Sequence, residues 1–105
     1  DMVRFIHALL EGRLCGDGYV SMMLTAQVPE RQELLRGYHS MYGFGCYLLL
    51  DDDGQVVRWG HTGEEDGVSC RLYHYPMLDV DVVVLGNQGG CAGSIAWEIH
   101  DLLMG

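Results

Sequence analysis

Four apolar runs separated by short polar reversals constrain the fold of this chain most strongly. The connections carry turn residues, as in Asp51-Asp52-Asp53-Gly54, and connections this short join antiparallel neighbours. Aliphatic and aromatic residues dominate the four runs, which are Tyr42–Leu50, Gln55–His61, Ser69–Tyr75 and Val80–Leu85. The pattern predicts four strands of one antiparallel meander within residues 42–86.

Helical periodicity flanks these strands on both sides. Residues 1–28 carry apolar side chains at helical spacing, and residues 91–104 place Ile95, Ile99, Leu102 and Leu103 on one face of a final helix. Residues 29–41 are polar and uneven, so we expect a connecting loop there. The predicted fold class is α+β, an antiparallel sheet meander with helices packed on it.

The last predicted strand indicates that residues 1–105 form a single partial domain. Val82-Val83-Val84-Leu85 is an unbroken apolar run, and such runs are typical of strands that are covered on both faces. The helices predicted here supply less cover than that sheet needs. We therefore expect part of the domain to come from elsewhere.

The charge composition excludes several partners and mechanisms. The formal net charge is -9, and the six basic residues are all Arg. An acidic surface repels phosphate backbones, so nucleic acid and anionic membranes are not expected as partners. Without lysine the chain has no Ser-x-x-Lys motif, no Schiff-base lysine and no phosphate-binding P-loop.

The cysteines predict neither a metal site nor a redox motif. Cys15, Cys46, Cys70 and Cys91 are widely spaced and form no Cys-x-x-Cys pair. We favour reduced thiols, which slightly favours the cytoplasm among compartments. The histidines show no metal-ligand spacing, so no metal and no other cofactor is expected.

His61-Thr62-Gly63 ends a predicted strand, and such a triplet can bring backbone N–H groups against a reacting carbonyl. In order and spacing, this triplet and its neighbouring motifs resemble the C-terminal region of the serine β-lactamase and penicillin-binding-protein-like hydrolases. The triplet is similar to the His-x-Gly motif of the esterase and aminopeptidase branch of that family. The accompanying motifs are Phe5–Gly12, Tyr42-Gly43-Phe44-Gly45, Tyr75-Pro76, Val82–Asn87 and Ala96-Trp97.

The resemblance implies a role for each residue of this motif. His61 would contact a substrate carboxylate or share in proton transfer, and Thr62 would hydrogen-bond a polar group of the substrate. Gly63 would complete the motif, and the backbone N–H of Glu64 would be one of two oxyanion donors. Glu65 and Asp66 would form an acidic rim that favours cationic substrates, although a short charge run is most often a solvated turn.

The resemblance implies a C-terminal fragment of a hydrolase that cleaves a small ester or amide through an acyl-serine intermediate. The fragment would be inactive alone, because the nucleophile motif is absent. Its partner would be the missing N-terminal part of the enzyme or further copies of the chain. One alternative is a non-catalytic module that oligomerises through an exposed sheet edge. Another is an independent enzyme that uses His61 with Glu64 or Glu65.

Overall fold

The computed structural model describes the backbone of residues 1–105 and every side chain except that of Asp17. Two helices precede a block of six strands, and one helix follows it. In chain order the elements are α1 (Met2–Leu10), α2 (Asp17–Met23), β1 (Val28–Pro29), β2 (His39–Tyr42), β3 (Tyr47–Leu50), β4 (Val56–Glu65), β5 (Val68–Tyr75), β6 (Val80–Gly86) and α3 (Ala92–Met104).

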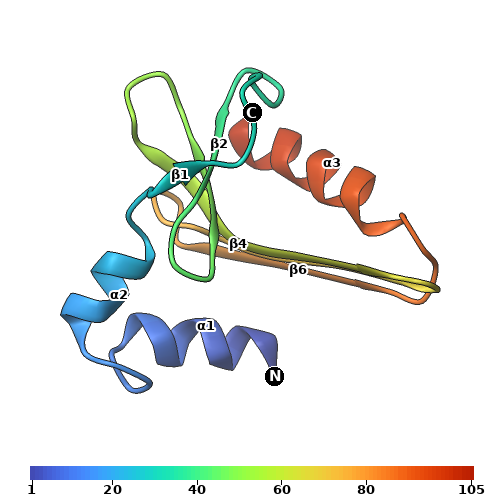
Figure 1. Ribbon diagram of the computed structural model, residues 1–105. Coiled ribbons are helices and arrows are strands. Elements are labelled where there is room, and N and C mark those ends of the chain that lie inside the picture. The colour runs from blue at the N-terminus through green and yellow to red at the C-terminus, as the bar shows by residue number, and fades with distance from the viewer.

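The six strands form one antiparallel sheet in the order β1-β2-β3-β4-β5-β6. Each strand therefore pairs with its neighbour in the sequence, as a meander does. Helices α1 and α2 lie on one side of the sheet and α3 on the other (Figure 1). The predicted α+β class is confirmed.

The number of strands in the prediction was wrong. Residues 29–41, expected to be a loop, contain the end of β1 and most of β2. The predicted strand Tyr42–Leu50 is instead a hairpin, because β2 ends at Tyr42 and β3 begins at Tyr47. Two glycines permit this turn: a Cβ on Gly43 would lie 2.2 Å from the carbonyl oxygen of Met23, and Gly45 has φ +81.

A hydrophobic core lies on each face of the sheet. The first core packs Ile6 and Leu9 of α1 against Leu48 and Trp59 of the sheet. The second core lies under α3, where Ala96 closes over Val57, Tyr73, Tyr75 and Val82. The sheet is thus the middle layer, and its two faces are held by different helices.

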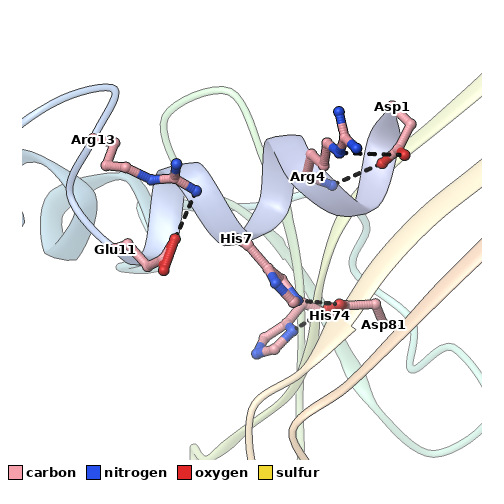
Figure 2. A network of polar contacts seen from close by, with 7 residues as sticks. All are labelled: Asp1, Arg4, His7, Glu11, Arg13, His74 and Asp81. Atoms are coloured by element: carbon pink, nitrogen blue, oxygen red, sulfur yellow. Dashed lines mark hydrogen bonds and ion pairs between the residues drawn. The ribbon is translucent and has the colours of Figure 1, made fainter.

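Histidine–aspartate contacts tie α1 to the far end of the sheet (Figure 2). Asp81 of β6 accepts hydrogen bonds from Nδ1 of His74 at 2.7 Å and from Nε2 of His7 at 2.8 Å. Burial raises the pKa of Asp81, but the two hydrogen bonds outweigh it, so the pKa lies below the ordinary value. The carboxylate is therefore charged where it joins the helix to the sheet.

The cysteines and the helices can also be compared with the expectations from sequence. Each of the four cysteine side chains is a free thiol, and burial raises the pKa of Cys46. Among the described residues, no helix combines the length and apolar character needed to cross a lipid bilayer.

Candidate functional site

The predicted site lies where β4 extends past its neighbour. Pairing between β3 and β4 ends at Tyr47 and Gly60, whereas pairing between β4 and β5 continues to Glu65 and Val68. Within the described part of the chain, residues 61–65 therefore have a strand partner on one side only. Their other edge is free to receive a ligand or another segment.

The register directs the Glu64 N–H toward this free edge. Glu65 and Val68 close a hairpin with a two-residue turn, and the closing pair of such a hairpin is hydrogen-bonded. Hydrogen-bonded and non-hydrogen-bonded pairs alternate along an antiparallel ladder. Glu64 and Ser69 form a non-hydrogen-bonded pair, so the N–H of Glu64 points away from β5. An oxyanion donor at this position must have that orientation.

His61 is exposed and held by two hydrogen bonds beside the free edge. Its Nδ1 donates to the carbonyl oxygen of Thr62 at 2.7 Å. In the neutral ring Nε2 is then the acceptor for the Tyr42 hydroxyl, 3.2 Å away. The ring also packs against Tyr47, with 4.7 Å between the two ring centroids. These contacts fix the tautomer and leave Nε2 as the proton acceptor.

Thr62 and Gly63 complete the motif in different ways. Thr62 is half-buried opposite Arg71 and lines a cavity between the sheet and α3. A Cβ added to Gly63 would lie 2.7 Å from the sulfur of Cys70. A larger residue at 63 would therefore require the Cys70 side chain to move.

The side chain of Glu64 has a structural task that the sequence did not predict. Its Oε1 accepts hydrogen bonds from Ser69 at 2.6 Å and Arg71 at 2.8 Å, and Oε2 accepts from the Gly90 N–H at 3.3 Å. The Ser69 and Arg71 hydrogen bonds hold the pKa of Glu64 below its usual range. Ser69 is fully buried and also accepts from the N–H of Ala92, the first residue of α3.

Glu65 and Asp66 lie at the tip of the β4–β5 hairpin, and both are exposed. Asp66 and Gly67 form the turn, for which Gly67 adopts φ +78. No ion pair involving Glu65 or Asp66 occurs among the described side chains. The tip therefore presents two solvated carboxylates next to the candidate site.

The structure gives no support to an independent His–Glu pair. The two ring nitrogens of His61 are hydrogen-bonded, Nε2 to Tyr42 and Nδ1 to Thr62. The Glu64 carboxylate is hydrogen-bonded to Ser69 and Arg71 instead. Among the described side chains, no group of three or more His, Cys, Asp or Glu residues is arranged to hold a metal ion.

Sequence reasoning missed two residues that shape the site. Tyr42, assigned to a strand motif, is the hydrogen-bond partner of His61, and Tyr47 is its packing partner. The two tyrosines are opposite each other on β2 and β3. A hairpin prediction between them would have paired them, but the continuous apolar run Tyr42–Leu50 predicts a single strand.

Comparison with known proteins supports the fold. A scan of family models and a search of curated proteins find no match to this chain. Among solved structures, the chain is similar to a penicillin binding protein from Bacillus halodurans, with a TM-score of 0.83 and 26% sequence identity. The chain has a penicillin-binding-protein-like fold. The match covers 96% of this chain and 29% of that protein.

At a coarse level, this likeness is consistent with a β-lactamase-like serine hydrolase. The chain spans under a third of the penicillin binding protein that it matches.

Proposed function

We propose that this chain is part of a β-lactamase-like serine hydrolase that cleaves esters or amides through an acyl-serine intermediate. It supplies the His61-Thr62-Gly63 strand and the Glu64 N–H. The chain contains no lysine and so no Ser-x-x-Lys nucleophile motif. Alone it is therefore inactive, and its partner is a polypeptide segment that carries the serine.

The observation that carries this proposal is the unpaired edge of β4 beyond Gly60. There the Glu64 N–H has no strand partner among the described residues, because β3 ends before it. A rigid strand presenting a free N–H at its edge suits an oxyanion donor, which must be oriented before charge develops. The structural similarity to a penicillin binding protein also supports the proposal of a β-lactamase-like hydrolase.

His61 and Thr62 would act beside this donor. With its Nδ1 proton held by the Thr62 carbonyl, His61 keeps Nε2 as an acceptor, and the exposed ring can take part in proton transfer. The Tyr42 hydroxyl would have to give up its bond to Nε2 when substrate binds. Thr62 would hydrogen-bond a polar group of that substrate.

A pair of substitutions at Glu64 tests the oxyanion role in the polypeptide encoded by the complete reading frame. Glu64→Pro removes the N–H, and proline is tolerated at an unpaired strand edge. Glu64→Gln keeps the N–H and alters only the side chain. Relative to Glu64→Gln, we expect Glu64→Pro to lower kcat/KM for a nitrophenyl ester by about 100- to 1000-fold. Equal activity of the two variants, or a reading frame without Ser-x-x-Lys, would refute the proposal.

The exposed carboxylates of Glu65 and Asp66 would give the site an acidic rim that favours cationic substrates. The double variant Glu65→Gln, Asp66→Asn tests this in the same polypeptide. We expect its preference for a cationic over an anionic ester to fall severalfold, roughly what one exposed charge pair contributes. An unchanged ratio of kcat/KM for the two esters would end the rim proposal.

A second candidate function is a non-catalytic module that associates through a sheet edge. The outer edge of β6 favours it, because β6 pairs only with β5 among the described strands, and Leu85 on β6 is 72% exposed. Native mass spectrometry of the chain distinguishes the candidates. A larger companion polypeptide indicates the hydrolase, and a homo-oligomer indicates the module.

A further inference from the structure

A cavity of about 170 Å³ lies on the α3 side of the sheet, adjoining the candidate site at Thr62. Its lining residues include the aromatic residues Tyr47, Tyr73 and Trp97, together with Arg58. A cavity of about 150 Å³ is large enough to hold a benzene ring. The space therefore suits a small aromatic molecule.

Arg58 is the unusual member of this wall. It is 4% exposed, and its guanidinium carbon lies 3.9 Å from the ring centroid of Tyr73 and 4.3 Å from that of Trp97. Rings pack on the faces of the guanidinium, so its polar groups remain at the edges of the plane. One of them, Nη1, donates to the Tyr75 hydroxyl at 3.1 Å.

Arg58 lacks a counter-ion among the side chains that the structure describes. No carboxylate oxygen lies within 4.0 Å of it. No fully enclosed polar side-chain atom is left without a hydrogen bond, so the unbonded nitrogens of Arg58 keep some accessible surface, and Arg58 is one of the residues that line the cavity. A buried cation is costly unless an anion compensates it.

The other charged residues of the wall do not supply that anion. Arg71 pairs with Glu64 at 2.8 Å. Glu30 is an exposed residue whose carboxylate accepts a hydrogen bond from the buried Ser40. Thus the buried part of the wall carries an uncompensated positive charge at Arg58, and a negative charge lies nearer the solvent at Glu30.

We propose that this cavity binds a small aromatic carboxylate, with the carboxylate on the free N–H edge of Arg58 and the ring among Tyr47, Tyr73 and Trp97. Arginine presents paired donors that match a carboxylate. The site is distinct from the Glu64 oxyanion position and does not depend on the proposed function.

Benzoate and benzamide test the proposal with the 105-residue chain itself. The two probes have nearly the same shape, but only benzoate is charged. We expect saturable benzoate binding by calorimetry and a shift of the Trp97 indole N–H signal in NMR spectra. Trp59 packs in the core on the other face, so its indole signal is an internal reference that should not move. Benzamide should bind at least about tenfold more weakly, since it lacks the charge.

Two variants are expected to change the affinity for benzoate in opposite directions. Arg58→Gln should weaken benzoate binding by about tenfold or more. Glu30→Gln, at an exposed residue, removes the repulsive carboxylate and should tighten binding by roughly two- to fivefold. If Arg58→Gln does not fold, Glu30→Gln and benzamide still decide the outcome. Equal binding of the two probes, absence of saturable binding, or no change in Glu30→Gln would overturn the proposal.

Discussion

Gly60 shapes the candidate site at the scale of a single residue. It is the last β4 residue paired with β3 and directly precedes His61. Its φ is +155, and a Cβ built on it would lie 1.8 Å from the carbonyl oxygen of Leu72. Only glycine lets β4 approach β5 this closely while its other edge leaves β3.

Gly60→Ala should therefore destabilise the fold strongly. We expect the free energy of unfolding to fall by about 3 kcal/mol or more, because backbone atoms cannot move aside as a flexible side chain can. Gly54→Ala is the matched control: it also has a positive φ, +79, but faces open space, and should cost only about 1 kcal/mol. Urea unfolding measures both, and similar losses would contradict the steric argument.

Buried polar residues mark the limit of prediction from sequence at this scale. Arg58 interrupts the apolar run Gln55–His61, yet it is buried by packing between rings that come from β5 and α3. His100 is likewise buried between the hydroxyls of Tyr38 and Tyr75. Burial, followed by the charge of Arg58, lowers the pKa of His100. No local pattern reveals partners this distant in the chain.

At the scale of elements, the hydrogen bond from His7 to Asp81 of β6 adds to the core packing of Ile6 and Leu9 in holding α1 against the sheet. The Asp81 side chain is 13% exposed and that of His74 is 6% exposed, whereas His7 is 57% exposed. The contact between His74 of β5 and Asp81 of β6 is thus buried, whereas His7, which reaches Asp81 from α1 (Figure 2), is largely exposed.

Asp81→Asn should destabilise the chain by about 1–3 kcal/mol, the usual cost of losing charge-assisted hydrogen bonds. Because the folded-state pKa of Asp81 is lowered, this stabilisation is complete above the ordinary value near 4 and is lost as pH falls through the folded pKa. The gap between wild type and variant should therefore close below about pH 4. Urea unfolding from pH 3 to 7 measures it, with Glu98→Gln on α3 as an exposed control; a constant gap would contradict this assignment.

The helices and the strands β5 and β6 could be predicted from sequence, whereas the short edge strands and the part of β4 beyond His61 could not. α1 and α2 lie within residues 1–28, where helical periodicity is predicted, and β5 and β6 begin within one residue of prediction. β1 has two residues, one of them Pro29, and gains its structure from pairing with β2. For α3 the buried residues are Ala92, Ala96 and His100, while the predicted Ile95 and Leu102 are exposed. Small residues bring that helix close to the sheet, and a pattern of large apolar residues misses them.

At the scale of the whole molecule, net charge opposes association through the open edge of β6. The chain carries a formal charge of -9, so two copies repel each other at low ionic strength. β6 nevertheless offers seven residues of strand with no outer partner among the described residues. Screening of the repulsion by salt should therefore expose any tendency of this edge to pair.

Leu85→Lys tests that tendency, because a lysine on an edge strand hinders pairing with another strand. We expect native mass and sedimentation to show more self-association of the wild-type chain at 0.5 M than at 0.02 M salt, and little in the variant. Leu102→Lys, on an 83% exposed residue of α3, makes the same charge change away from the edge and should associate at least as well as wild type. Both variants should unfold within about 0.5 kcal/mol of wild type, since the replaced side chains are exposed. If Leu85→Lys associates like Leu102→Lys, or if the wild-type chain stays monomeric at high salt, β6 is not an association surface. Its open edge then fits the partial domain proposed for the hydrolase.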